Sequence, residues 1–378
     1  MRLDAFTKRV MRKNKSNQSR LPLTISAQYG LVDQVTFFNK IVASTDLSNY
    51  YLLKKGDFAY NKSYSSDYPW GAIKRLDNYD QGALSSLYIC FTPQDNVVSD
   101  FIRQYFESPK WHKGISEIAV EGARNHGLLN VSVQDFFHTY HYVPKDKKEQ
   151  IKISKLLMLL DERSATQNKI IEDLKKLKSA IIEKHYSQVK KRTTCIADLG
   201  EPFSVGSLAK DDLVEIGSPC VIYGELFTTY GEIIFHIESY TNKTDGMILS
   251  KKGDLLFPSS TTVDAISLIA PSVINVDGVI LGGDMFGIHI SHNYNAQYLS
   301  YYFNHIAKRQ LAKFAKGSTI IHLHYADIEK AKLLLPSLEE QNRMAKCIMS
   351  LDAKINIESF FIILLNSQKT HLLRQMFI

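Results

Sequence analysis

The sequence predicts an α/β fold of the α+β kind, in which two similar globular units are separated by two long antiparallel helices that form a coiled-coil-like spacer. Three observations predict this fold. The chain contains one long internal repeat, the first part of each copy alternates short β-type runs with turn residues, and the second part has helical periodicity without Gly or Pro. The 378 residues exceed one average domain, so two or three domains are expected, and the repeat predicts an approximate twofold between the halves.

The repeat consists of an ordered series of matches. The string KKGD occurs at Lys54–Asp57 and again at Lys251–Asp254, an offset of 197 residues. The later matches are Tyr105-Phe106 with Tyr302-Phe303, Pro144 with Pro336, Glu149-Gln150 with Glu340-Gln341, and Asp161 with Asp352. The offset falls steadily from 197 to 191 along this series, as small deletions in the second copy would produce, whereas chance matches would scatter.

The first part of each copy, residues 1–144 and 193–336, is expected to fold as a compact α/β unit. Leu87–Phe91 and Ile233–Ile237 are two of its β-type runs, and Gly, Asn, Ser and Asp residues separate such runs. The Gly-Asp of each KKGD string is a predicted turn former ahead of a strand, because Gly permits a positive φ and Asp hydrogen-bonds its own backbone.

The second part of each copy, residues 145–192 and 337–378, is predicted to be one long helix. Both copies follow one heptad register. It runs through Leu157, Leu160, Ser164, Gln167, Ile171, Leu174, Lys178, Ile181 and His185 in the first copy, and through Ile348, Leu351, Ile355, Glu358, Ile362, Leu365, Lys369, Leu372 and Met376 in the second. The apolar side chains of this register form a stripe along each helix that must be buried. The other long helix is expected to bury it; the alternative is that each helix packs on its own globular unit. At 1.5 Å per residue, a helix of about 40 residues is a rod of about 60 Å.

Positive charge is concentrated in two stretches. The chain has 46 Lys and Arg against 39 Asp and Glu, a net charge of +7, which permits an anionic partner without requiring one. Residues 1–20 carry a net +6 and residues 145–192 a net +7. The first stretch is either a flexible arm that lies on phosphates or a merely solvated arm.

The remaining composition predicts a cytoplasmic protein with reduced thiols. No apolar run approaches the ~20 residues of a membrane-spanning helix, and residues 1–20 lack the apolar stretch of a secretory signal. The four cysteines, Cys90, Cys195, Cys220 and Cys347, form no CxxC pair, which argues against a zinc ribbon.

Two similar units on a stiff spacer suit a long ligand that presents two separated features. Duplex DNA is the natural candidate, because its grooves repeat every ~34 Å and a pseudo-symmetric reader can contact two half-sites. The sequence contains neither GxxxxGK[ST], which phosphoryl-transfer motors use, nor the Asn-Pro-Pro-aromatic signature of adenine methyltransferases. The absence of both motifs supports a chain that does not itself catalyse a reaction.

Candidate DNA contacts are donor-rich side chains after strands or glycines. They are Tyr60, Asn61, Lys62 and Ser63 after the first KKGD strand, Arg124 and Asn125 after Gly122, and Lys316, Ser318 and Thr319 around Gly317. Asn suits adenine, and Lys and Arg suit guanine or phosphate. His138 with His141, and His322 with His324, lack a third nearby ligand, so they are interpreted as core or surface histidines, and no metal site is expected.

Several segments in this order resemble a known family. They are Leu21–Ser26 with Gly30 and Val32, KKGDFAYNKS at Lys54–Ser63, Tyr68–Ile73, Gly82, Ser86–Tyr88, Gly122–Arg124 and Pro144–Gln150. Each copy then closes with Pro, Glu-Gln and, eleven residues later, Leu-Asp: Pro144, Glu149-Gln150 and Leu160-Asp161, then Pro336, Glu340-Gln341 and Leu351-Asp352. The order and duplication resemble the specificity subunit of a type I restriction-modification system, over nearly the whole chain.

The resemblance implies a non-catalytic subunit with target-recognition domains at 1–144 and 193–336. In such systems each domain reads one half of a bipartite DNA site, and the central (145–192) and distal (337–378) conserved helices act as the spacer. Two modification subunits dock to form an adenine methyltransferase, and motor and nuclease subunits complete the restriction enzyme. S-adenosylmethionine, ATP and Mg²⁺ belong to those partners, and none is expected on this chain. The first domain is expected to be trimmed at its start or completed by the other end of the chain.

Two other functions stay open at this point. The two-domain size is compatible with a self-contained DNA-modifying enzyme, and the long helices are compatible with a scaffold protein that brings other proteins together.

Overall fold

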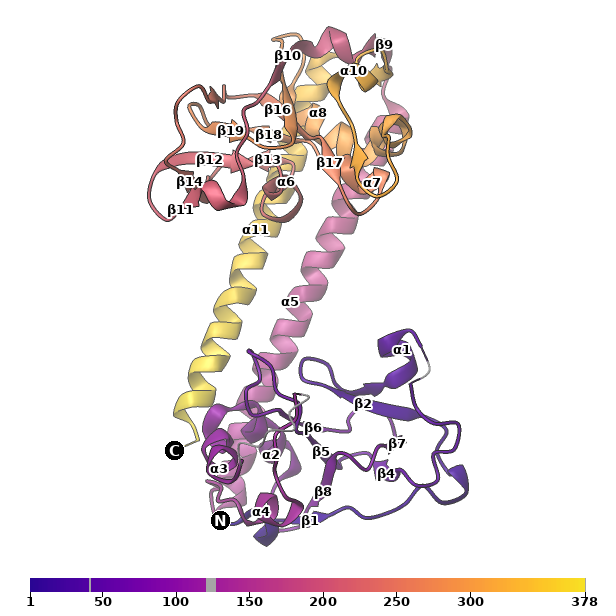
Figure 1. Ribbon diagram of the computed structural model, residues 1–378, viewed down its shortest axis with the longest axis vertical. Helices are drawn as coiled ribbons and strands as arrows, with labels where there is room; N and C mark the ends of the chain where they lie inside the picture. Colours follow the sequence, from indigo (N-terminus) through magenta and orange to yellow (C-terminus); the bar gives the residue numbers. More distant parts are fainter. Residues whose placement is uncertain (41, 120–126, 378) are drawn as a thin grey trace. The chain divides into compact units, whose positions relative to one another are not determined.

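The computed structural model describes residues 1–40, 42–119 and 127–377, which form two compact units (Figure 1). Unit 1 consists of Met1–Asn168 together with Phe360–Ile378, and unit 2 of Lys169–Ser359. Two long helices, α5 (Lys147–Gln188) and α11 (Leu338–Gln375), therefore each contribute one part to each unit. The division of the chain into four segments at residues 144, 192 and 336 stays a prediction, because the compact units cut across both helices.

Unit 1 contains two four-stranded sheets, with strand orders β1-β8-β5-β6 and β3-β2-β7-β4. The strands are β1 (Thr7–Arg9), β2 (Pro22–Ser26), β3 (Gly30–Asp33), β4 (Tyr51–Lys54), β5 (Phe58–Asn61), β6 (Ala72–Arg75), β7 (Gln81–Leu84) and β8 (Ile89–Pro93). The shorter helices are α1 (Gln34–Phe38), α2 (Ser99–Glu107), α3 (His112–Ile118) and α4 (Val133–His138). The sheet that contains β5 packs on α2 and α4 through an aromatic core in which Phe58, Phe91 and Phe136 are fully buried.

Unit 2 repeats this plan with two five-stranded sheets, ordered β10-β20-β16-β18-β13 and β11-β14-β12-β19-β15. The strands of these sheets are β10 (Gly200–Ser204), β11 (Leu213–Val214), β12 (Ser218–Ile222), β13 (Ile233–Ile234), β14 (Ser239–Thr241), β15 (Ile248–Leu249), β16 (Asp254–Pro258), β18 (Ser272–Ile274), β19 (Ile280–Gly282) and β20 (Met285–Ile290). Two further pairs are β17 (Ser260–Thr261) with β21 (Ile321–His322) and β9 (Arg192–Cys195) with β22 (Lys332–Leu335). The shorter helices are α6 (Glu225–Thr228), α7 (Ala265–Leu268), α8 (Ala296–Tyr302), α9 (Lys308–Leu311) and α10 (Tyr325–Ile328).

Strand register shows that the two units are copies of one fold. In unit 1 Phe58 pairs with Phe91, and in unit 2 Leu255 pairs with Ile288; both partners are shifted by 197 residues. The parallel pairs β2·β7 and β12·β19 also correspond, and each is flanked by an antiparallel strand on either side. The predicted fold class and its internal repeat are confirmed.

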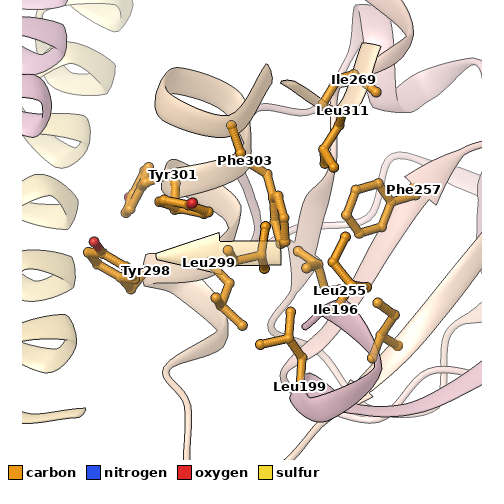
Figure 2. Packing of buried hydrophobic residues seen from close by; sticks show 14 of the residues in the cluster. Ile196, Leu199, Leu255, Phe257, Ile269, Tyr298, Leu299, Tyr301, Phe303 and Leu311 are labelled. Atoms are coloured by element: carbon orange, nitrogen blue, oxygen red, sulfur yellow. The ribbon is translucent and has the colours of Figure 1, made fainter. Parts of the chain in front are cut away.

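The core of unit 2 places aromatic side chains of α8 against the long helices. Leu255 and Phe257 of β16 are fully buried in this core, and Tyr298 and Tyr301 lie on its side that faces the long helices (Figure 2). Ile348 of α11 is fully buried in the same cluster. In unit 1, Leu157 of α5 has the corresponding position in the core. The globular cores thus cover part of the heptad stripe, as the alternative interpretation required.

The long helices also contact each other within each unit, and they run antiparallel there. In unit 2, Lys178 bonds Asp352 at 2.7 Å and His185 contacts Glu340 at 3.2 Å. In unit 1, Lys369 bonds Asp161, and Arg163 lies over the ring of Phe361. The residue numbers rise along one helix as they fall along the other, which is the antiparallel pairing that the heptad pattern predicted.

The first 20 residues form part of the fold of unit 1. Leu3 and Phe6 are buried in the aromatic core, and Val10 is buried in the second core of the unit. Arg12 forms an ion pair with Asp57. The interpretation of this stretch as a flexible basic arm is therefore wrong, because its apolar residues anchor it between the strands.

The end of α11 completes the core of unit 1. Phe377 contacts Phe101 and Tyr105 edge-on, at ring-centroid distances of 5.4 Å, and Leu373 is buried in the same cluster. The chain's other end therefore contributes to this unit, which was one of the two expectations. Within the described residues, no helix is long and apolar enough to cross a membrane.

Candidate nucleic-acid interface

A tight turn precedes the strand that leads to the first candidate loop in each unit. The glycines of the two KKGD strings have φ values of +91° at Gly56 and +95° at Gly253, a region that favours glycine. The carboxylate of Asp57 accepts a hydrogen bond from the Lys54 backbone N–H at 2.7 Å, and Asp254 accepts the same bond from Lys251 at 2.8 Å. The predicted turns are confirmed, and they start β5 and β16, which lead to the candidate loops.

The end of β5 pairs with a second segment of unit 1. Ser63 forms an antiparallel bridge with Leu128, and the Leu129 N–H donates to the carbonyl of Lys62 at 2.9 Å. The Tyr64 N–H donates to the carbonyl of Gly127 at 3.1 Å. Two chain segments about 65 residues apart thus form one surface, which we call loop pair 1 and define as residues 61–64 with 127–129.

Unit 2 contains the same pairing. Ser260 pairs with His322 in β17·β21, and the Leu323 N–H donates to the carbonyl of Ser259 at 2.9 Å, as Leu129 does to Lys62. We call residues 258–261 with 321–323 loop pair 2. The backbone frame is the same in both units, whereas the side chains differ.

Most of the predicted contacts around loop pair 1 have exposed surface. Asn61 and Lys62 are half-buried and Ser63 is exposed. The Asn61 side-chain oxygen accepts the Ser63 backbone N–H at 3.0 Å, which orients the asparagine at the end of the strand. Arg124 and Asn125 lie outside the described residues, so their role stays a prediction.

Tyr60 does not belong to the surface. Its ring is fully buried, stacks on Phe136 at a centroid distance of 4.9 Å, and packs edge-on against Trp111. Its hydroxyl donates to the carbonyl of Trp70 at 2.9 Å, and burial raises the pKa of this hydroxyl above its usual value. The prediction that Tyr60 contacts DNA is wrong, because β5 continues to Asn61 and turns Tyr60 toward the core.

The predicted contacts of unit 2 lie on the turn that precedes β21. Lys316, Ser318 and Thr319 are exposed, and the Lys316 ammonium bonds the carboxylate of Asp327. Gly317 has φ +112°, and a Cβ there would lie 2.1 Å from the carbonyl oxygen of Ile320, so the turn requires glycine. Lys316 and the His324 backbone N–H together lower the pKa of Asp327.

Residues that were not predicted to contact DNA complete this surface. Asp284 and His322 line one cavity of about 510 Å³ with Ser259, Lys316, His324 and Asp327. The Ser260 hydroxyl donates to Asp284 at 2.8 Å. His322 and His324 are surface residues, as interpreted, but they were not predicted to contact DNA. The repeat could have identified His322, because it follows Gly317 as Leu128 follows Gly122.

The histidines of unit 1 are structural or peripheral. His141 is buried and bonds Tyr105 at 3.2 Å and Thr139 at 2.7 Å, and burial lowers its pKa to about 3, so the ring is neutral. His138 is exposed. In the described part of the chain, no three His, Cys, Asp or Glu side chains are grouped so that they could hold a metal ion.

Comparison with known proteins finds a matching family model and a related protein. Residues 208–364 match the family model described as the type I restriction modification DNA specificity domain. The specificity subunit of the type I restriction enzyme MjaVIII of Methanocaldococcus jannaschii is 23% identical over 303 residues, which cover 74% of this chain and 69% of that protein.

Two solved structures have the same fold. The S subunit of a type I restriction-modification system from M. genitalium aligns over 100% of this chain and 95% of that chain, with 15% identity and a TM-score of 0.57. A chain from a structure described as showing the structural basis underlying complex assembly and conformational transition of the type I R-M system aligns over 99% of this chain and 95% of that chain, with 14% identity and a TM-score of 0.60. Residues 208–364 thus match a type I restriction modification DNA specificity domain, and the whole chain has the fold of these two structures and is similar to the MjaVIII specificity subunit.

Proposed function

We propose that this chain recognises a bipartite DNA sequence, and that loop pair 1 reads one half-site and loop pair 2 the other. The observation that carries the proposal is the repetition of one backbone frame with different side chains. Ser63 and Ser260 occupy the same place in their frames, but their partners across the bridge are Leu128 and His322. A shared frame fixes how each unit meets a groove, and different side chains at its surface give different base preferences.

The exposed polar side chains supply the contacts of this proposal. Asn61 and Lys62 in unit 1 suit adenine and guanine or phosphate respectively. In unit 2, Lys316, Ser318 and Thr319 offer donors to phosphate or base edges. Arg124 and Asn125 are proposed as further contacts of unit 1 from their sequence alone.

The long helices have two roles in the proposal. They set the interval between the half-sites, and two modification subunits dock near them to form an adenine methyltransferase. Motor and nuclease subunits then complete the restriction enzyme. S-adenosylmethionine, ATP and Mg²⁺ are bound by those partner subunits, the chain itself catalyses nothing, and the assembly works in the cytoplasm.

The test is selection of bound sequences from a random duplex library by the full chain in complex with its modification subunits. We expect a split motif, adenine methylation within it, and sub-micromolar affinity. The chain alone, incubated with DNA, Mg²⁺ and S-adenosylmethionine, should neither cleave nor methylate. Selection of an unsplit motif or of none, or robust turnover by the chain alone, would contradict the proposal.

A domain exchange assigns each half-site to a unit. Replacing residues 1–143 with the corresponding domain of another specificity subunit should change one half-site and leave the other unchanged. Lys62→Ala should weaken binding at the half-site of unit 1, while Lys8→Ala, which alters an exposed residue of β1 outside the loop pair, should have little effect. A change of both half-sites on domain exchange would argue against independent reading.

A further inference from the structure

The registers of the two loop pairs identify which surface positions correspond. In unit 1, the recorded ladder between β5 and β8 ends with Tyr60 paired to Ile89, and Leu87 lies in the turn two residues before Ile89. In unit 2, Phe257 pairs with Phe286, and the ladder continues with the Ser259 N–H donating to the carbonyl of Asp284 at 2.7 Å. Leu87 and Asp284 correspond in the repeat, at the offset of 197 residues that also relates the pair Phe58–Phe91 to the pair Leu255–Ile288.

Two more positions correspond in the same way. Leu128 and His322 are the bridge partners of Ser63 and Ser260. The next positions along are Tyr64, whose N–H donates to Gly127, and Thr261, which pairs with Ile321. The matched positions are thus Leu87 with Asp284, Leu128 with His322, and Tyr64 with Thr261.

Unit 1 presents apolar groups at all three positions. Leu87 is 75% exposed, Leu128 47% and Tyr64 44%. Large apolar side chains that are exposed at matched positions of a repeat indicate a contact surface, because their exposure to water is unfavourable unless something covers them.

Unit 2 presents polar groups at the same positions. Asp284 and His322 line one cavity, and one Asp284 carboxylate oxygen accepts the Ser260 hydroxyl at 2.8 Å. The Lys316 ammonium in the same cavity bonds Asp327, and among the described residues it forms no ion pair with Asp284. The Asp284 carboxylate is therefore held in place at the surface with its negative charge uncompensated by a salt bridge in this part of the chain.

We infer that these matched positions set opposite base preferences: Leu87 and Leu128 select thymine methyl groups in one half-site, and Asp284 selects a base with a major-groove amino group, cytosine or adenine, in the other. The inference rests on the proposed function, because it requires that the loop pairs, and with them Leu87 and Asp284, face the grooves. It assigns a chemical class of base to each unit.

The chemistry follows from the major-groove edges of the bases. Thymine carries a C5 methyl group that apolar side chains cover, and cytosine and adenine carry amino groups that a carboxylate accepts from. Guanine and thymine offer carbonyl oxygens in the groove, which would face the Asp284 carboxylate without a donor between them. A carboxylate also repels phosphates, so it favours binding only when it faces a base edge.

The experiment is library selection with the full chain in complex with its modification subunits, for Asp284→Leu and for the Leu87→Ala/Leu128→Ala double variant. Asp284→Leu should lose a roughly tenfold preference for amino over carbonyl bases at one position of one half-site. The double variant should lose a thymine preference in the other half-site only. Ile216→Ala, which alters an exposed residue of unit 2 outside the loop pair, is the matched control.

Modified DNA tests the same claim on the unaltered protein. Uracil in place of the selected thymine should weaken binding about fourfold for each methyl lost, and should leave the double variant unaffected. 2-Aminopurine in place of a selected adenine, which removes the major-groove amino group, should weaken binding in the Asp284 half-site. A split motif that is unchanged in all variants and insensitive to the base analogues would overturn this inference and leave the proposed function standing; failure to select any split motif would overturn both.

Discussion

Gln150 and Gln341 make the same two hydrogen bonds at the start of the two long helices. The Gln150 side chain accepts the Val98 N–H at 2.7 Å and donates to the carbonyl of Pro144 at 2.7 Å. The Gln341 side chain accepts the Asn295 N–H at 3.0 Å and donates to the carbonyl of Pro336 at 2.9 Å. Both glutamines are buried, so each ties a helix start to the globular part of its unit.

Replacing either glutamine with alanine removes the hydrogen-bond partner of two backbone groups that are half-buried or buried. We expect Gln341→Ala to lower the free energy of unfolding by about 1–3 kcal/mol. Urea unfolding of the full chain measures it, with the exposed Lys346→Ala on the same helix as control. A loss no larger than that of the control would mean that the two hydrogen bonds do not stabilise the helix start.

Glu232 is the residue whose titration carries a prediction for acid stability. Burial alone would raise its pKa, but the hydrogen bond with His305 at 2.9 Å and the charge of Lys178, also at 2.9 Å, outweigh burial and lower the pKa to about 2. A carboxyl group with a lowered folded-state pKa stabilises the fold above its unfolded-state pKa, near 4.5, and this stabilisation is lost as the pH falls toward 2.

Glu232→Gln should therefore cost roughly 1–3 kcal/mol at pH 7 and progressively less below pH 4.5. Urea unfolding of both proteins at pH 7, 5 and 3.5 measures the difference. The exposed Glu201→Gln in the same unit serves as control. A difference between the two proteins that stays constant over this pH range would contradict the assignment of the lowered pKa to Glu232.

Residue roles were predicted well where local backbone geometry decides them and poorly where distant packing decides them. The Gly-Asp turns follow from the preference of glycine for positive φ, which needs no tertiary information. The burial of Tyr60 depends on Phe136, 76 residues away, and the sequence offered no sign of that contact. Asp284 was missed for the same reason, because β20 brings it beside Ser260.

At the scale of elements, two equivalent ion pairs join the two long helices. Each carries one Asp and one Lys at equivalent positions: Asp161 and Lys178 on α5, Asp352 and Lys369 on α11. Asp161 pairs with Lys369 in unit 1, and Lys178 with Asp352 in unit 2. Gln104 and Tyr301 also correspond in the repeat. Gln104 donates to the second carboxylate oxygen of Asp161 at 2.9 Å, and Tyr301 donates to that of Asp352 at 2.6 Å.

The lysine of unit 2 is the more buried and serves two carboxylates. The Lys178 side chain is 8% exposed and bonds both Glu232 and Asp352, whereas Lys369 is 20% exposed and bonds Asp161. Lys178→Met should cost about 3 kcal/mol, because it leaves two half-buried carboxylates without their cation. Lys369→Met should cost about 1 kcal/mol.

Thermal or urea unfolding of the two variants tests this order, with the exposed Lys175→Met on α5 as a control for the loss of charge. Equal losses in the two variants would mean that the Glu232 contact adds nothing to the pair.

The helices themselves were predictable because they lack Gly and Pro and keep one heptad register. Their attachment to the globular cores through Leu157 and Ile348 was not, since periodicity shows that a face is buried but not what buries it.

At the scale of the whole molecule, the repeat made the architecture predictable from one sequence. A run of matches in constant order required two copies of one fold, and strand order and register repeat accordingly. The contribution of Phe377 to unit 1 was expected only as one of two alternatives, because sequence comparison within a chain does not say which segments complete a core. The same equivalence of positions gives the helices a testable role as a ruler.

Gln167 of α5 and Glu358 of α11 are equivalent positions in the heptad register, so matched insertions can lengthen both helices together. Adding seven residues after each keeps the heptad register and adds about 10 Å of helix, or about three base pairs of DNA. If the helices set the interval between the half-sites, library selection should return both half-sites unchanged with a gap longer by about three base pairs. Seven residues added to α5 alone should instead destabilise the protein, because the two helices then differ in length between the units. A doubly extended protein that still selects both half-sites at the original gap would show that something other than the helices fixes the interval.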